Sequence, residues 1–233
     1  MRKFWDFRNE GGSRVLRIEG AIAEESWFDD DTTPKLFRDE LEAEAGDIIV
    51  WINSYGGDVF AAAQIYNMLR EYAGKVTVKI DGIAASAASV IAMSGDETLM
   101  SPVSCMMVHN PWTCAMGDSA EMLRAKAALD EIKQSILNAY EIKTGLSRVR
   151  ISHLMDAETW MNAHRAVDLG FADGVIGEDD SVMARNELGG LRRFEFSRMA
   201  AFNSFIGKLK PEPKAGPGAH ADDLHRRLNL LRR

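Results

Sequence analysis

The chain has 233 residues, 46% of them hydrophobic, and a formal net charge of −7. This length suits one domain of ordinary size with an appendage. No apolar run reaches the ~18 residues of a membrane-spanning helix, and the first residues lack the apolar stretch of a signal peptide. Cys105 and Cys114 are too few for a disulfide framework and have no metal-ligand spacing. We therefore expect a soluble protein of a reducing cytoplasm, without metal or cofactor.

The charge divides the chain into two parts. Residues 1–184 carry 17 Lys/Arg and 30 Asp/Glu, whereas residues 185–233 carry 11 and 5. An acidic body lacks the cations that phosphate contacts need, which argues against nucleic-acid binding. A Pro- and Gly-rich segment at 211–218 precedes a short basic amphipathic stretch at 224–233. We predict a folded body over 1–177 and a basic, partly flexible C-terminal tail over 178–233.

Strand-like and helix-like segments alternate along the body. Period-two or continuous apolar patterns predict strands at 14–18, 47–52, 76–80, 98–100, 105–109 and 171–176. Helical patterns cover 34–45, 58–72, 86–94, 118–144, 147–155 and 162–169, and a turn is expected at 53–57. This order predicts an α/β fold with a mostly parallel sheet and right-handed crossovers.

The helix predicted at 118–144 is unusually long. Asp118 and Glu121 have the spacing of a capping box, and Gly145 is a common helix stop. Apolar residues form one stripe along it: Met122, Ala125, Leu129, Ile132, Ile136 and Tyr140. Either the whole stripe packs inside the domain, or part of it packs on another subunit.

Two segments that follow predicted strands could stabilise or perform nucleophilic chemistry. Gly56 and Gly57 let the backbone approach a ligand and can leave N–H groups for an oxyanion, although a tight turn with Asp58 as helix cap explains them as well. Ser86 opens a helix rich in small residues, where free N–H groups favour negative charge. The alternative for Ser86 is a structural serine bonded to backbone carbonyls, and Ser89 fits that role better.

His109 ends an apolar strand, and Pro111 turns the chain out of it. A serine and a histidine at the carboxyl ends of neighbouring strands can meet, because strand ends of open α/β sheets share one edge. Nucleophilic catalysis requires such a base within hydrogen-bond reach. Asp156 or Glu158 could orient the imidazole, as the acid of a triad does.

Four segments in this order resemble the Clp protease proteolytic subunit. They are WINSYGG at 51–57, GIAAS at 82–86, MMVHNP at 106–111 and MNAHRAVDLGFAD at 161–173. The similarity extends over roughly residues 14–177 and looks greatest to the Clp-like proteases that phages and prophages use in head maturation. It implies a Clp protease or crotonase-like fold with repeated ββα units, a long protruding handle helix and ring-shaped homo-oligomers, which can stack.

The resemblance also implies roles for individual residues. The family's nucleophile falls on Ser86 and its base on His109, while the oxyanion hole falls on the backbone N–H groups of Gly57 and Ala87. The family's triad aspartate falls on Glu158. Two positions depart from the family pattern.

The first departure is Tyr55, which stands where the family usually has proline and so removes a preset φ. The second is the acid itself, because Glu158 is longer than aspartate and Asp156 lies two residues earlier. Either carboxylate could complete the triad, and the register favours Glu158.

The resulting prediction is a serine endopeptidase that hydrolyses peptide bonds through an acyl-enzyme and acts on capsid or scaffold polypeptides in the cytoplasm of a bacterial host. An unfoldase partner is left open. Two alternatives remain: an inactive ring-forming assembly protein of the same fold, motivated by the departures at Tyr55 and Glu158, and a crotonase-like acyl-CoA enzyme, which shares the glycine turn.

Overall fold

The computed structural model describes residues 3–22 and 32–178. The predicted tail, with its linker at 211–218 and amphipathic stretch at 224–233, lies outside the described residues. Within the part that is described, the helices are too short or too polar to cross a membrane.

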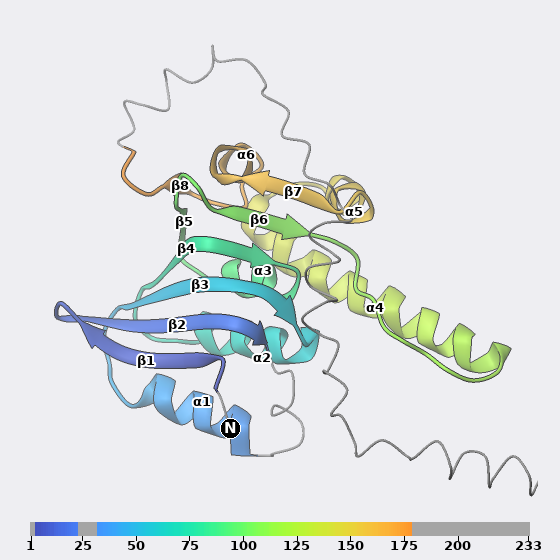
Figure 1. Ribbon diagram of the computed structural model, residues 1–233, viewed down its shortest axis with the longest axis horizontal. Helices are drawn as coiled ribbons and strands as arrows, with labels where there is room; N and C mark the ends of the chain where they lie inside the picture. Colours follow the sequence, from blue (N-terminus) through green and yellow to red (C-terminus); the bar gives the residue numbers. More distant parts are fainter. Residues whose placement is uncertain (1–2, 23–31, 179–233) are drawn as a thin grey trace, which may run out of the picture. The chain divides into compact units, whose positions relative to one another are not determined.

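One sheet of eight strands forms the centre of the body (Figure 1). Its continuous path runs β1-β2-β3-β4-β5-β8, and β6 pairs with β4 and with β7. The strands are β1 (Trp5–Glu10), β2 (Ser13–Ile22), β3 (Ile48–Gly57), β4 (Val76–Ala85), β5 (Glu97–Met100), β6 (Cys105–Val108), β7 (Thr159–Asn162) and β8 (Gly174–Val175). Neighbours from β2 to β8, and the β4–β6 pair, are parallel, whereas β1 and β7 are antiparallel edge strands. The predicted α/β fold with a mostly parallel sheet is confirmed.

The strands differ from the prediction at their ends. The expected turn at 53–57 is wrong, because β3 stays paired with β2 as far as Gly57, with a register shift near its end. The last strand is confined to residues 174–175. Strands β1 and β7 were not predicted, since each is short and contains only two apolar residues.

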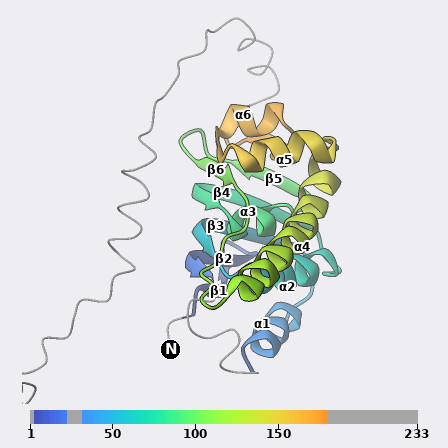
Figure 2. The same cartoon turned by 90° about the vertical axis from the view of Figure 1, so that its right-hand side faces the viewer.

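Six helices accompany the sheet within the described residues. They are α1 (Thr32–Glu42), α2 (Val59–Arg70), α3 (Ala87–Ala92), α4 (Ser119–Thr144), α5 (Arg148–Asp156) and α6 (Ala163–Asp168). Figures 1 and 2 show α2, α3 and part of α4 on one face of the sheet, with α3 behind β3 and β4. Every residue of α3 is buried, and its alanine and serine side chains are small enough to let the helix pack closely on the sheet. The contact between α3 and strands β3 and β4 is thus fully buried on the side of α3.

The long helix α4 has two unlike halves. Asp118 caps its start by accepting hydrogen bonds from the N–H groups of Ala120 and Glu121, and Gly145 ends it in the left-handed conformation with φ 67°. Its C-terminal half is buried at Ile136, Leu137, Ala139 and Tyr140. Its N-terminal half extends away from the sheet (Figure 1), and Met122 on the apolar stripe is 40% exposed. Within this single chain, only the C-terminal half of the stripe packs as a core helix does.

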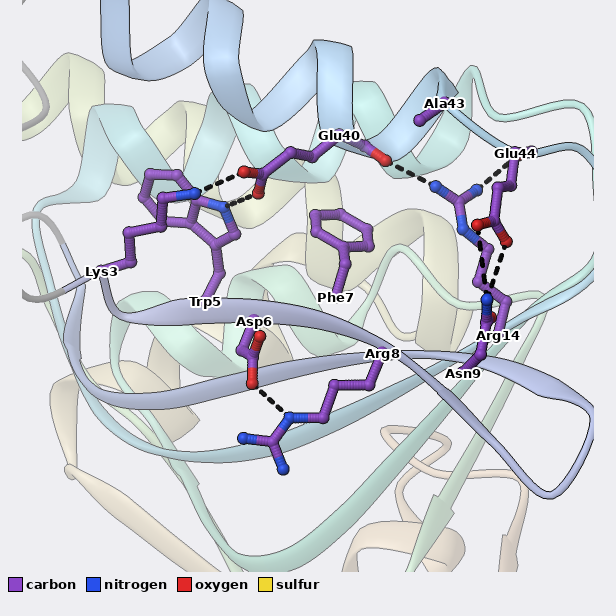
Figure 3. A pocket seen from close by; sticks show the side chains of 10 residues that line it. All are labelled: Lys3, Trp5, Asp6, Phe7, Arg8, Asn9, Arg14, Glu40, Ala43 and Glu44. Carbon is purple, nitrogen blue, oxygen red and sulfur yellow. Dashed lines mark hydrogen bonds and ion pairs between the residues drawn. The ribbon is translucent and has the colours of Figure 1, made fainter.

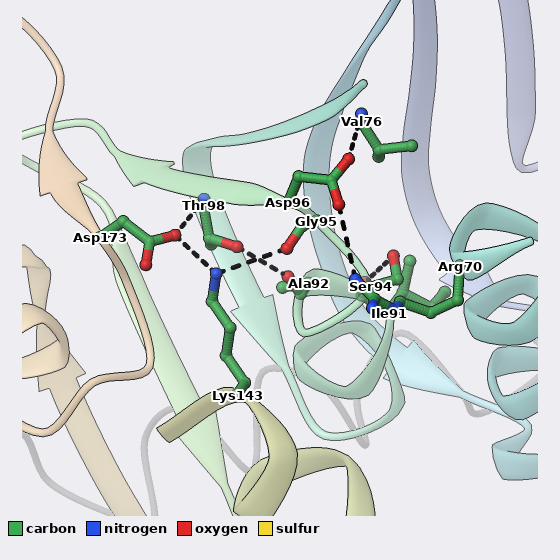
Figure 4. A network of polar contacts seen from close by, with 10 residues as sticks. All are labelled: Arg70, Val76, Ile91, Ala92, Ser94, Gly95, Asp96, Thr98, Lys143 and Asp173. Atoms are coloured by element: carbon green, nitrogen blue, oxygen red, sulfur yellow. Dashed lines mark hydrogen bonds and ion pairs between the residues drawn. The ribbon is translucent and has the colours of Figure 1, made fainter. Parts of the chain in front are cut away.

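Polar contacts fasten the end of α4 to the sheet (Figure 4). The Lys143 ammonium lies 2.5 Å from Asp173 Oδ2, and the same oxygen accepts the N–H of Thr98 at 2.6 Å. The N–H of Asp173 returns a hydrogen bond to the carbonyl of Thr98 at 2.7 Å. Because Thr98 is on β5, these bonds fix the C-terminal half of α4 against the sheet.

A second polar cluster joins β1 and β2 to α1 (Figure 3). Buried Arg14 donates to the carbonyl oxygens of Glu40 and Glu44 at 2.5 Å each, and Trp5 Nε1 donates to the Glu40 carboxylate at 2.8 Å. The hollow at this point, about 340 Å³, is lined by these paired side chains. Its charged groups largely satisfy one another, so we assign the cluster to the stability of this edge.

Candidate active site

The pairing of β4 with β6 brings Ser86 and His109 together. Ala85 lies opposite Met107 in this parallel pair, and the N–H of Ser86 donates to the Met107 carbonyl at 3.0 Å. Ser86 directly follows β4, and His109 directly follows β6. The two side chains therefore leave the sheet at the same edge, as the sequence predicted.

Ser86 Oγ lies 2.7 Å from Nε2 of His109, which is hydrogen-bond distance. Ser86 occupies the cap position of α3, yet its hydroxyl makes no capping hydrogen bond to the helix. Its backbone has φ 55° and ψ −126°, which is strained for a residue with a side chain. The hydroxyl is thereby turned to the imidazole rather than to its own helix.

The end of β3 packs directly on the Ser86 turn through Gly56. A Cβ placed at Gly56 would lie 2.8 Å from the Ala85 carbonyl oxygen, 2.8 Å from Ser86 Cβ and 2.9 Å from the Ala87 nitrogen. The N–H of Gly56 donates to Ser54 Oγ at 3.1 Å, and Ser54 Oγ donates to the Gly20 carbonyl at 2.5 Å. Only glycine fits at this position.

The two predicted oxyanion residues have different surroundings. Ala87 is the first residue of α3, where helix geometry leaves the N–H without an intrahelical partner. A Cβ at Gly57 would meet the backbone of Ile22 on β2, with the Ile22 oxygen at 2.2 Å. Gly56 is therefore the glycine packed on the Ser86 turn, and Gly57 is required where β3 meets β2.

His109 is half-buried at the sheet edge. Burial lowers the pKa of His109, because the charged imidazolium loses solvation, and the negative charge of Glu158 raises it in part. The imidazole is therefore neutral near pH 7 and can accept a proton at Nε2 if Nδ1 carries the other.

The two candidate acids are in different environments. Asp156 accepts hydrogen bonds from Lys133 at 2.6 Å and from Asn110 at 2.9 Å. The Lys133 ammonium, and to a lesser extent the Asn110 amide, hold the pKa of Asp156 below its usual range. Glu158 is half-buried, has a positive φ of 48°, and accepts a long hydrogen bond of 3.4 Å from Trp160 Nε1. Across residues 3–22 and 32–178, neither carboxylate is hydrogen-bonded to His109.

Three residues at the site were not predicted to matter. Ser54 Oγ accepts a hydrogen bond from the N–H of Gly56. Asn110, the residue after His109, donates a hydrogen bond to Asp156, and Tyr140 is hydrogen-bonded to Ser89. A hydroxyl residue two positions before Gly56 was the available signal for Ser54. The Tyr140 contact joins residues 51 positions apart, so no local pattern could reveal it.

The described residues contain no group of three or more His, Cys, Asp or Glu side chains that could hold a metal ion. The groups that lie at this edge are a hydroxyl, an imidazole, backbone N–H groups and a nearby carboxylate. Together with the fold, these features define an α/β protein with a serine–histidine pair of the kind used in nucleophilic catalysis.

The chain belongs to the Clp protease family, whose model matches residues 13–179. It is 31% identical over 151 residues to "ATP-dependent Clp protease proteolytic subunit 1" of Chlamydia abortus, covering 63% of this chain and 78% of that protein. It is 31% identical over 130 residues to the ATP-dependent Clp protease proteolytic subunit of Chlorella vulgaris, covering 55% and 65%. The equivalent protein of Bacteroides fragilis is 30% identical over 132 residues, covering 56% and 64%. The family supports peptidase activity.

Proposed function

We propose that this chain is a serine endopeptidase in which Ser86 is the nucleophile, His109 the base and Glu158 the acid. The observation that carries the proposal is the 2.7 Å contact between Ser86 Oγ and His109 Nε2 at one edge of the sheet. A neutral imidazole at this distance can take the hydroxyl proton as the oxygen attacks. Family membership supports the same reaction class.

The reaction follows from these positions. Ser86 Oγ bonds to the carbonyl carbon of the substrate while its proton moves to His109 Nε2. His109 then gives that proton to the leaving amine nitrogen as the C–N bond breaks, which leaves an acyl-enzyme. Water next attacks the ester and gives a proton to His109, which returns it to Ser86 Oγ as the acid product leaves.

We assign the oxyanion hole to the N–H groups of Ala87 and Gly57. Ala87 is supported by its place at the first turn of α3, next to Ser86 and in contact range of Gly56. Backbone donors already fixed by the fold stabilise a developing oxyanion without reorganisation. Gly57 is the next residue of the same strand end, and the resemblance to the family assigns it this role.

We prefer Glu158 to Asp156 as the orienting acid. The carboxylate of Asp156 is already bonded to Lys133, Asn110 and Ser152, and it faces solvent. Glu158 is the carboxylate whose charge acts on the pKa of His109. We propose that the Glu158 side chain accepts the Nδ1 hydrogen bond of His109 once substrate is bound, since such bonds tighten in the substrate complex.

The proposal extends to assembly and substrate on the strength of the family resemblance. Rings of this chain would enclose the active sites, and the exposed half of α4 offers an apolar stripe for contact between copies. Capsid and scaffold polypeptides are the proposed natural substrates. No feature of the site favours the inactive assembly protein or the acyl-CoA enzyme.

Reaction with a fluorophosphonate tests the nucleophile. In that reaction Ser86 Oγ would bond to phosphorus and fluoride would leave. We expect Ser86→Ala to abolish labelling of the purified chain, and His109→Gln to slow it by about 10²–10⁴-fold because the general base is lost. Intact-protein mass spectrometry measures both effects.

The control is Ser119→Ala, which removes an exposed serine at the start of α4 and leaves labelling unchanged. Wild-type chain that stays unlabelled, or labelling that persists in Ser86→Ala, would overturn the proposal. Capsid and scaffold polypeptides incubated with wild type and Ser86→Ala test the substrate, since only wild type should cleave them.

A further inference from the structure

The strained backbone of Ser86 must be held by its surroundings. A residue with a side chain at φ 55° and ψ −126° persists only where neighbouring bonds over-determine it. The N–H side of Ser86 is fixed by the hydrogen bond to Met107 on β6. The carbonyl side is fixed by Ser89 alone among the described residues, through two hydrogen bonds.

Ser89 donates two hydrogen bonds to the Ser86 carbonyl, one from its backbone N–H and one from its hydroxyl. Its backbone N–H lies 2.9 Å from the Ser86 oxygen, and its Oγ lies 2.5 Å from the same atom. Ser89 is fully buried, with no exposed surface. In a dry environment such hydrogen bonds are stronger than in water, and their loss leaves an unpaired polar group.

Tyr140 of α4 extends this arrangement. Its hydroxyl lies 2.8 Å from Ser89 Oγ. Because the single hydroxyl proton of Ser89 is donated to the Ser86 carbonyl, Ser89 Oγ must accept here and Tyr140 must donate. Burial raises the pKa of Tyr140, so the phenol keeps its proton and remains a donor. Its ring packs edge-on against Phe171 at 5.4 Å between centroids.

We propose that Ser89 and Tyr140 are positioning residues for the nucleophile: a buried chain of hydrogen bonds from Tyr140 to Ser89 to the Ser86 carbonyl keeps Ser86 Oγ aimed at His109. This inference rests on the proposed peptidase function. Neither side chain touches substrate, and both act through the backbone of Ser86. This row of hydrogen bonds also connects α4, which carries the exposed apolar stripe, to the residue whose hydroxyl would react.

The competing explanation is that the two hydroxyls only stabilise α3. Ser94 provides a matched control, because it lies just beyond the C-terminal end of α3, is 1% exposed, and donates through Oγ to the carbonyl three residues earlier, that of Ile91, at 2.7 Å. Ser94→Ala removes the same kind of bond as Ser89→Ala without touching Ser86.

The experiment measures fluorophosphonate inactivation of the full chain and separates the maximal rate, kinact, from the binding constant, KI. We expect Ser89→Ala to lower kinact about 10–100-fold with KI unchanged, because a small misplacement of the reacting atom costs this much. Tyr140→Phe, a milder change, should lower kinact several-fold. Ser94→Ala should lower the melting temperature but leave kinact at the wild-type value.

Two further readouts separate positioning from general damage. The double variant Ser89→Ala/Tyr140→Phe should react no more slowly than Ser89→Ala, since the two residues act in series. The acid limb of the pH profile should stay in place in both single variants, because the surroundings of His109 are untouched. Only the plateau rate should fall.

The inference is overturned by wild-type kinact in Ser89→Ala or Tyr140→Phe, or by an equal loss in Ser94→Ala. If Ser89→Ala does not fold, Tyr140→Phe alone decides, since it keeps the Ser89–Ser86 bond. Failure of the proposed function gives a different result, because wild type itself then does not react.

Discussion

The pKa of His109 sets the pH range in which the proposed base can work. Burial lowers this pKa below its ordinary value of about 6.5, and Glu158 opposes the shift. Acylation needs the neutral imidazole, so the rate should fall only when the pH drops below that lowered pKa. Wild-type chain should therefore keep most of its labelling rate at pH 6.5.

Glu158→Gln tests whether Glu158 is the orienting acid and in which direction it shifts the pKa of His109. Removing the carboxylate removes the effect that raises the pKa of His109, so the acid limb of the labelling rate should move to lower pH. The plateau rate should fall by about 10²–10⁴-fold, because the imidazolium would lose the orienting partner that we propose for it. Labelling reactions quenched at a series of times and pH values measure both the position of the acid limb and the plateau rate.

Asp156→Asn is the matched control, since this carboxylate is hydrogen-bonded to Lys133 and Asn110 and does not act on the pKa of His109. Its acid limb should stay where the wild type has it. A limb that moves in Asp156→Asn and not in Glu158→Gln would exchange the roles of the two acids.

At this scale the sequence was informative about Ser86 and His109 because each directly follows a strand of a parallel sheet. The acid could not be decided from sequence, since Asp156 and Glu158 are two residues apart and the choice depends on side-chain partners such as Lys133. Tyr140 contacts the site through tertiary packing, 51 positions from Ser89. Its contribution has no local signature.

At the scale of elements, the end of β3 supports the turn that carries Ser86. Gly56 has φ 99°, and any Cβ there would overlap the Ser86 turn at 2.8 Å. We expect Gly56→Ala to cost about 1–3 kcal/mol in backbone strain alone and to abolish labelling, because Ser86 must move. Chemical denaturation and fluorophosphonate labelling measure the two effects.

Gly145→Ala separates strain from displacement. Gly145 has φ 67°, but a Cβ there meets nothing within 4 Å. It should cost about 1–2 kcal/mol and leave the labelling rate unchanged. Labelling of Gly56→Ala at the wild-type rate would show that β3 does not constrain the nucleophile.

The order of elements was predictable because buried parallel strands and amphipathic helices have distinct periods in sequence. The turn expected at 53–57 was wrong for a physical reason: the two glycines stay paired to β2, and the hydroxyl of Ser54 donates to the Gly20 carbonyl of the same strand. The edge strands β1 and β7 depend on partners distant in sequence, namely β2 and β6. No strand was predicted for either segment from its local pattern.

At the scale of the whole molecule, α4 connects an apolar surface to the proposed nucleophile. Its C-terminal half is buried, and Lys143 and Tyr140 bind it to the body. Its N-terminal half carries Met122 at 40% exposed and Leu123 at 67% exposed. Apolar surface left open in one chain favours association, since burial gains about 25 cal/mol per Å².

The stripe on α4 can therefore be tested as the contact between copies. Met122→Glu with Leu129→Glu places two charges on the stripe, and we expect sedimentation velocity to show smaller species with unchanged circular dichroism. Ala128→Glu with Ser135→Glu places the same charges on an exposed side of the helix away from both Met122 and Leu123 and should leave the assembly intact. Disruption by both double variants, or a wild-type chain that sediments as a monomer, would contradict this role. Because Tyr140 is on the same helix, loss of labelling together with loss of assembly would further indicate that α4 couples association to the position of Ser86.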